Sequence, residues 1–260
     1  MHPTHAPLVT HDVVDSVATI TLNRPPVNAV NPELIEALLP ICREVAADPE
    51  VRCIVLTGAG RQFVAGADIN VMNELTEESQ LKMHRWTDVL RCLEEAPKPV
   101  IAGINGHALG GGAELTLACD LRLASSRATI GFPEISLGLF PGAGGSVRLP
   151  RLIGAHRAAL AMIEGTRFRA DDALNQGLVD KVVPEDQFDE ELVKIAAEFA
   201  AKPTRAIGEI KRLVRISTDR SLAEAEGEEF QAVLRLLVTD DLAEGFDAFL
   251  QKRKPVFKGQ

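Results

Sequence analysis

A succession of short apolar runs rich in β-branched residues constrains the fold of this chain more than any other feature. Residues 51–57 and 99–104 are two such runs, and each leads into a glycine-containing loop. Their length and composition are typical of buried strands, whereas residues 78–94, between them, have the length and apolar spacing of a helix. Strands and helices that alternate along one chain predict an α/β domain.

The same kind of pattern continues on both sides of this region. Residues 8–14 and 17–22 alternate apolar with polar or small residues, which predicts an opening β-hairpin. The pair Asn31-Pro32 is a favourable N-cap and first-turn sequence, and it begins a helix predicted to end near residue 48. Further strands are expected at 121–124 and 178–183, and helices at 189–201, 204–216, 222–237 and 242–252. The last third of the chain is therefore expected to be helical.

Size, charge and cysteine spacing argue against several classes of protein. A chain of 260 residues can bury a substantial core without a metal ion or a disulfide. The formal net charge of -9 disfavours nucleic acid and anionic membranes as partners. The four cysteines include no C-x-x-C pair, and no apolar run reaches the roughly 20 residues of a membrane-spanning helix. The first residues lack the basic and apolar regions of a signal peptide. We therefore expect a cytoplasmic protein without a metal site.

The densest chemical signal is the segment 105–115, in which three consecutive glycines follow a predicted strand and open a helical run. Uncovered N–H groups at such a junction can bind negative charge. A second loop of small residues, 63–69, follows the strand at 51–57. One N–H group from each loop could form a two-donor oxyanion hole. By itself, the glycine run is more commonly explained as a tight turn that packs a helix closely against a sheet.

A carboxyl group in apolar surroundings is the third signal. Glu134 lies in the segment 131–146, which is rich in glycine and apolar residues. Desolvation raises the pKa of a carboxyl group, which suits a residue that exchanges protons near neutral pH. The structural alternative is a glutamate that is hydrogen-bonded within its loop.

Taken together, these segments resemble the crotonase (enoyl-CoA hydratase/isomerase) superfamily. The matching segments are Leu22 to Pro25, Ala65 to Ile69, Asn105 to Leu115, Pro133 to Gly145 and Phe249 to Lys258. The resemblance covers nearly the whole chain and implies a crotonase (ClpP-like) spiral of β-β-α units with a helical C-terminal region. It implies an α/β core with an acyl-CoA site at residues 1–195 and a helical region for packing and trimerisation at 196–260. A homotrimer, or a hexamer built as a dimer of trimers, is the assembly it implies.

The resemblance also implies roles for particular residues. The backbone N–H groups of Ala67 and Gly111 match the oxyanion hole that holds the thioester carbonyl of an acyl-CoA. Glu114 and Glu134 match the catalytic pair, with Glu114 activating water for attack on C3 and Glu134 delivering the proton to C2. The implied reaction is that of an enoyl-CoA hydratase, a hydro-lyase that adds water syn to a 2-trans-enoyl-CoA and gives a 3-hydroxyacyl-CoA.

Coenzyme A enters this reaction as part of the substrate, so no separate cofactor is expected. Its contacts are expected at Ala65, Ala67, Asp68, Ile69, Asn70, Gly111 and Lys258. Many relatives carry a lysine where Asn70 stands, which leaves the contacts to the CoA phosphates open. Lys258 is equally well explained as a solvated charge near the end of the chain.

Three other functions compete with the hydratase reaction. A 3,2-enoyl-CoA isomerase on the same fold needs one proton shuttle, and the presence of both Glu114 and Glu134 favours the hydratase. A non-catalytic scaffold or RNA-binding relative is disfavoured by the acidic balance and the intact glutamate pair. A short-chain dehydrogenase is excluded because the chain has no tyrosine and the loop after residue 57 lacks the third glycine of a dinucleotide fingerprint.

Overall fold

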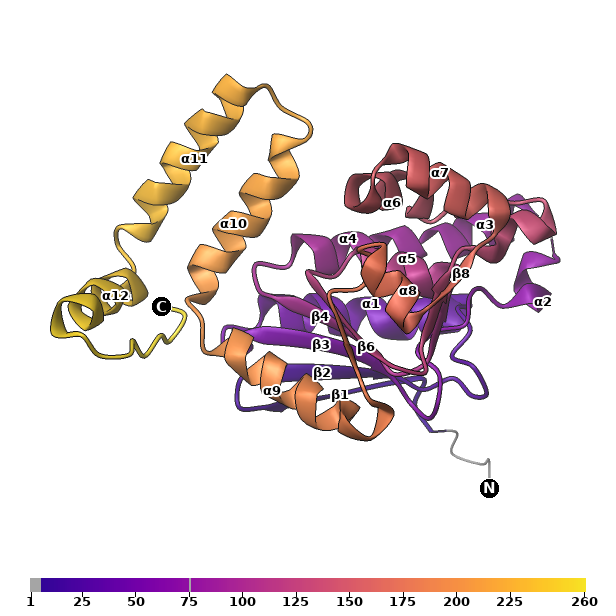
Figure 1. The fold of residues 1–260 in the computed structure, drawn as a ribbon, viewed down its shortest axis with the longest axis horizontal. Coiled ribbons are helices and arrows are strands. Elements are labelled where there is room, and N and C mark those ends of the chain that lie inside the picture. The colour runs from indigo at the N-terminus through magenta and orange to yellow at the C-terminus, as the bar shows by residue number, and fades with distance from the viewer. Residues whose placement is uncertain (1–5, 75) are drawn as a thin grey trace.

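The computed structural model describes residues 6–74 and 76–260, and its central element is a six-stranded sheet (Figure 1). The strands lie in the order β1 (Val9–Val14), β2 (Val17–Leu22), β3 (Cys53–Gly58), β4 (Val100–Ile104), β6 (Leu121–Ser125) and β9 (Lys181–Val183). The β1–β2 pair is the predicted antiparallel hairpin, and every other pair of neighbours is parallel. The carboxyl ends of β2, β3, β4 and β6 therefore meet at one edge of the sheet, where ligand sites of α/β proteins usually form.

A second, smaller sheet lies beyond this edge and was not predicted from the sequence. Its order is β5 (His107–Leu109), β7 (Thr129–Gly131) and β8 (Arg167–Arg169). β5 pairs with β7 in parallel, and β7 pairs with β8 in antiparallel. The small sheet matters for the site because the glycine run follows β5 directly and Glu134 follows β7 by three residues.

Helices cover both faces of the main sheet. One face packs on α1 (Pro32–Ala47) and α4 (Trp86–Glu95), which contribute to the larger core cluster. The other face packs on α9 (Phe188–Ala200), whose apolar residues join the outward residues of β3, β4 and β6 in a second cluster. The remaining core elements are α2 (Ile69–Met72), α3 (Glu77–His84), α5 (Gly111–Leu117), η1 (Pro133–Leu137), α6 (Gly145–Ile153), α7 (Ala155–Glu164), α8 (Ala170–Asn175) and η2 (Glu185–Gln187).

Two predicted elements differ from the structure in extent. The helix expected over 78–94 is two helices, α3 and α4, with a break at Arg85. The strand expected over 178–183 is shorter, and only Lys181–Val183 pairs with β6. Asn31 caps α1 as expected, because its side chain accepts a hydrogen bond from the backbone N–H of Leu34 at 3.0 Å.

The chain ends in three helices that stand away from the sheet, here named the C-terminal arm (Figure 1). The arm consists of α10 (Thr204–Ser217), α11 (Leu222–Leu236) and α12 (Asp240–Gln251), followed by the tail. Polar contacts attach it to the core: Lys211 of α10 forms an ion pair with Asp120 at 2.6 Å, and Arg52 donates to the carbonyl of Phe257 at 2.7 Å. The predicted division after residue 195 falls inside α9, which packs on the sheet. None of the described helices is long and apolar enough to cross a membrane.

Candidate active site

The two small-residue loops singled out in the sequence lie side by side at the edge of the sheet. Val64 forms a parallel bridge with Ala108 in β5. The N–H of Val64 donates to the carbonyl of His107 at 3.0 Å, and the N–H of Leu109 donates to the carbonyl of Val64 at 2.9 Å. Segment 63–69 is therefore joined by hydrogen bonds to the strand that leads into the glycine run.

The other side of segment 63–69 is held by Val30. The N–H of Val30 donates to the carbonyl of Gly66, and the N–H of Asp68 donates to the carbonyl of Val30, both at 2.8 Å. Successive N–H groups of an extended segment point to opposite sides. The N–H of Ala67, which lies between these two bonds, therefore points away from Val30 and has no acceptor within residues 6–74 and 76–260.

The glycine run begins with a backbone conformation that favours glycine. Gly110 has a φ of 51° and a ψ of -121°, and its N–H donates to the carbonyl of Gly131 at 2.9 Å. A Cβ atom on Gly110 would lie 3.6 Å from the Cα of Gly66, so the two loops are in close contact. Gly111 is the first residue of α5, and its N–H likewise has no acceptor in the described part of the chain. The structure thus brings the loops of Ala67 and Gly111 together.

Glu114 projects from the first turn of α5 into the core. Its side chain is buried, and one carboxylate oxygen accepts hydrogen bonds from the N–H groups of Ala143 and Gly145, both at 2.9 Å. Burial raises the pKa of Glu114, an effect that the two hydrogen bonds and the charge of Arg148 partly offset. A Cβ atom on Gly145 would lie only 3.0 Å from that oxygen, so glycine at 145 allows the close approach.

Glu134 reaches the same region from the first turn of η1. Its Oε1 atom lies 3.0 Å from the position that a Cβ atom on Gly110 would occupy, which places the carboxyl group beside the glycine run. Its Oε2 atom is buried and has no hydrogen-bond partner among the described residues. Burial, together with the nearby charge of Glu114, raises the pKa of Glu134 to about 7. The two carboxyl groups therefore lie close together in unlike surroundings. Glu114 accepts two hydrogen bonds, whereas the buried Oε2 atom of Glu134 accepts none from the described residues.

The other predicted CoA contacts are divided between two parts of the molecule. Asp68 caps α2 by accepting from the N–H of Asn70 at 3.0 Å, and it forms an ion pair with Arg24 at 2.5 Å. Ile69 and Asn70 are exposed beside it, and Ala65 lies in the same segment. These residues form one surface next to Ala67.

Lys258 lies in the C-terminal tail, away from segment 63–69. Its N–H donates to a carboxylate oxygen of Asp241 at the start of α12, at 2.6 Å. The neighbouring Phe257 contacts Arg52, which precedes β3, whereas segment 63–69 follows β3. Lys258 is therefore at the opposite end of the sheet from Ala67, and its contact with CoA stays a prediction.

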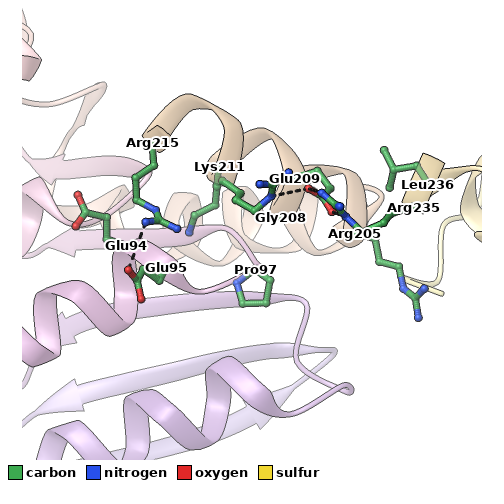
Figure 2. A pocket seen from close by; sticks show the side chains of 11 residues that line it. Glu94, Glu95, Pro97, Arg205, Gly208, Glu209, Lys211, Arg215, Arg235 and Leu236 are labelled. Carbon is green, nitrogen blue, oxygen red and sulfur yellow. Dashed lines mark hydrogen bonds and ion pairs between the residues drawn. The ribbon is translucent and has the colours of Figure 1, made fainter. Parts of the chain in front are cut away.

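Two cavities lie along the C-terminal arm rather than at the glutamate pair. The first, of about 370 Å³, lies between α4, α10 and α11 and is lined by ion-paired arginines and glutamates (Figure 2). Figure 2 shows the ion pair between Arg215 and Glu95. Glu209 forms ion pairs with Arg212 and Arg235 in the same cavity wall. The second, of about 470 Å³, is apolar and lies between α10 and α12. Neither is lined by Glu114 or Glu134, so neither bears on the chemistry of that pair.

One buried side chain that supports the site was missed in the sequence. Asn28 has a φ of 54°, and its side-chain amide donates to the carbonyls of Gln62 at 2.9 Å and Phe63 at 3.1 Å, at the start of segment 63–69. The side-chain oxygen of Asn28 accepts a hydrogen bond from the backbone N–H of Arg24 at 2.9 Å. Its position close after the Leu22 to Pro25 motif was the available signal, but the two carbonyls to which it donates are more than 30 residues away.

Residues 12–260 match the family model described as enoyl-CoA hydratase/isomerase. The chain is 39% identical to the 2,3-dehydroadipyl-CoA hydratase of Escherichia coli K12, with 94% of this chain and 96% of that protein covered. It is 38% identical to the crotonyl-CoA hydratase of Syntrophomonas wolfei, with 94% and 95% covered. A crystal structure of an enoyl-CoA hydratase from Bacillus anthracis superposes with a TM-score of 0.92 at 37% identity, covering 97% of this chain and 100% of that one.

The chain belongs to the enoyl-CoA hydratase/isomerase family of the crotonase superfamily. The resemblance seen in the sequence is thereby confirmed, as is the crotonase fold with its helical C-terminal region. No group of three or more His, Cys, Asp or Glu side chains in the described ranges is placed to hold a metal ion. The expected absence of a cofactor and the cytoplasmic location stay predictions.

Proposed function

We propose that this protein is an enoyl-CoA hydratase that adds water to the 2,3-double bond of a 2-trans-enoyl-CoA. The observation that carries the proposal is the pair of neighbouring carboxyl groups, buried Glu114 and half-buried Glu134, beside the N–H groups of Ala67 and Gly111. Hydratases among its relatives support the same reaction class. The substrate class is an acyl-CoA thioester, and CoA is part of the substrate.

Each group has a role that its surroundings favour. The N–H groups of Ala67 and Gly111 donate to the thioester oxygen, which gains negative charge as water attacks C3. Glu114 accepts a proton from the water, so that hydroxyl bonds to C3 and the electrons of the double bond move into an enolate. Glu134 then donates a proton to C2. The sum is one water added per double bond, and the proposed addition is syn, with the hydroxyl and the proton delivered to one face.

The unlike surroundings of the two carboxyl groups support this division of labour. Glu134 has a pKa near 7, so a large fraction carries a proton at neutral pH. Burial raises the pKa of Glu114, and two N–H groups and the charge of Arg148 partly offset this by favouring its ionised form. Two carboxyl groups in unlike surroundings can divide acid and base work within one site.

The substrate assay separates the hydratase from the isomerase. Hydration of a 2-enoyl-CoA removes the conjugation between the double bond and the thioester, so ultraviolet absorbance falls on adding the protein. Isomerisation of a 3-enoyl-CoA creates that conjugation, so absorbance rises. We expect a fall with 2-enoyl-CoA substrates of at least one chain length. Conversion of 3-enoyl-CoA without hydration of any 2-enoyl-CoA would assign the isomerase reaction instead.

The rate of hydration should depend on pH in the range set by Glu134. Because the protonated form of Glu134 is the acid, kcat/KM should fall as pH rises through about 7. It should also fall at lower pH, where Glu114 becomes protonated and loses its function as a base, so the profile is bell-shaped. Its two limbs belong to the coupled pair. The residual activity of Glu134→Gln should lose the alkaline limb, and an unchanged alkaline limb in this variant would contradict the assignment.

The C-terminal arm supports a proposal about assembly. Many of its apolar side chains are exposed among the residues that the structure describes; they include Ile210, Val214, Phe230, Leu237, Phe246, Phe249 and Leu250. Exposed apolar area of this extent is typical of association surfaces. We propose that the arm forms the interface of a homotrimer or of a dimer of trimers. Native mass should then be three or six times the 28.0 kDa of one chain, and a mass of one chain at micromolar concentration would contradict this.

A further inference from the structure

Trp86 links the start of one helix to the start of another. It is the first residue of α4, its side chain is 2% exposed, and it is the single tryptophan of the chain. Its indole Nε1–H donates to the carbonyl oxygen of Gly111, the first residue of α5, at 3.1 Å. The same glycine carries one of the two N–H groups that the proposed oxyanion hole requires.

The backbone of the glycine run depends on contacts with other segments to hold its position. Residues 110–112 have no side chains that could pack, and glycine has the greatest backbone freedom of any residue. The N–H of Gly110 is held by Gly131, and its carbonyl accepts from the N–H of Glu114, both at 2.9 Å. Among residues 6–74 and 76–260, Trp86 supplies the one side-chain hydrogen bond to this run.

Trp86 and Val30 both lie close to Gly111. A Cβ atom on Gly111 would lie 3.5 Å from the Nε1 atom of Trp86 and 3.7 Å from the Cγ2 atom of Val30. The backbone of Val30 also holds the residues on either side of Ala67. Contacts at Val30 and Trp86 therefore set where the N–H of Gly111 lies relative to the N–H of Ala67.

We propose that Trp86 is a positioning residue for the oxyanion hole, acting through its hydrogen bond to the carbonyl of Gly111. The inference rests on the proposed function, because it concerns the N–H group that would stabilise the enolate oxygen. The hydrogen bond fixes the carbonyl group of Gly111. It therefore limits rotation about the backbone bonds of Gly111, whose N–H group is the donor. Without it the donor is displaced or mobile, and stabilisation is lost mainly in the transition state, where the oxygen is most negative.

A purely structural role predicts a different result. A buried indole N–H needs an acceptor, and loss of one neutral hydrogen bond lowers stability modestly wherever it lies. Such a loss would lower the melting temperature and leave the chemistry of bound ligands unchanged. A positioning role predicts a loss of kcat with little change in KM, together with weaker stabilisation of a bound enolate.

The single tryptophan allows a substitution that removes only the hydrogen-bond donor. Growth with 3-benzothienylalanine replaces the indole N–H of Trp86 by sulfur, keeps the size of the ring system and changes no other residue of the chain. Trp86→Phe is the second variant. The matched control is Thr87→Val, which removes the hydrogen bond from the Thr87 hydroxyl to the carbonyl of His84 in the same helix turn without touching Gly111.

Two readouts are measured on the full-length protein. The first is turnover of a 2-enoyl-CoA, for which both Trp86 variants should lose about 5- to 50-fold in kcat with KM changed less than about threefold. The second is the near-ultraviolet absorbance of bound acetoacetyl-CoA, a 3-ketoacyl thioester that ionises to an absorbing enolate. The wild-type protein and Thr87→Val should show the enolate band, and the Trp86 variants should bind the ligand with a weaker band.

The second readout separates this inference from the proposed function. If the wild-type protein hydrates no enoyl-CoA but shows an enolate band that the Trp86 variants lose, the inference stands and the hydratase proposal fails. If the protein is a hydratase and the Trp86 variants keep both kcat and the band, the inference is wrong while the function stands. A wild-type protein that binds acetoacetyl-CoA with no enolate band contradicts the inference as well.

Discussion

Replacing Glu114 with glutamine is expected to lower kcat by about 10²- to 10⁴-fold, the usual contribution of a positioned general base. The amide oxygen of glutamine can still accept the hydrogen bonds from Ala143 and Gly145, so the buried site keeps its shape. What is lost is the ability to accept a proton from water. Steady-state hydration of a 2-enoyl-CoA measures the effect, and thermal unfolding checks that the fold is retained.

Glu164→Gln is the matched control for this substitution. Glu164 is the exposed last residue of α7, so the same chemical change is made away from the site. The control should keep wild-type kcat. If Glu114→Gln retained more than about a tenth of wild-type kcat, Glu114 would not be the base.

Replacing Gly112 with alanine is expected to damage both stability and catalysis. A Cβ atom on Gly112 would lie 2.0 Å from the carbonyl oxygen of Val64 and 2.7 Å from the Cβ atom of Val64. The backbone of one of the two segments must therefore move. The cost in unfolding free energy should be about 1–3 kcal/mol or more. The movement would separate the loop of Ala67 from that of Gly111, and loss of one oxyanion donor lowers kcat by about 10²- to 10³-fold.

Gly227→Ala provides the control for the change from glycine to alanine. Gly227 lies inside α11, and a Cβ atom there would have no atom within 4 Å. Alanine should raise the unfolding free energy by about 0.5–1 kcal/mol at this exposed helical position. Urea unfolding and kcat are measured for both variants. Wild-type kcat in Gly112→Ala would show that contact between the two loops is not needed for activity.

The sequence predicted the main sheet and the long helices well, because these have clear periodicity and end signals. It missed the small sheet of β5, β7 and β8, whose strands have three residues each and are too short to show an alternating pattern. It also missed α6, because that helix begins in a run of glycines and contains Pro150, both of which are typical of loops. The break at Arg85 is marked by neither glycine nor proline.

The candidate site was predicted unevenly for similar reasons. The glycine run and the two glutamates stand out as local motifs, and the resemblance to the crotonase superfamily gave them roles. Their partners are not local: Glu114 accepts from residues 29 and 31 positions further along the chain. The place of Lys258 depends on where the tail folds back, and contacts with Arg52 and Asp241 hold the tail at the other end of the sheet. Such contacts require the tertiary structure.

The most direct test of the central claim is the fate of solvent atoms in the product. A 2-trans-enoyl-CoA is converted by the protein in ¹⁸O-labelled water and, separately, in deuterated water, and the acyl product is analysed by mass spectrometry and NMR. The hydratase account predicts one ¹⁸O at C3 and one deuterium at C2, both added to the same face. A product with no ¹⁸O, or deuterium incorporated with movement of the double bond alone, would contradict the account.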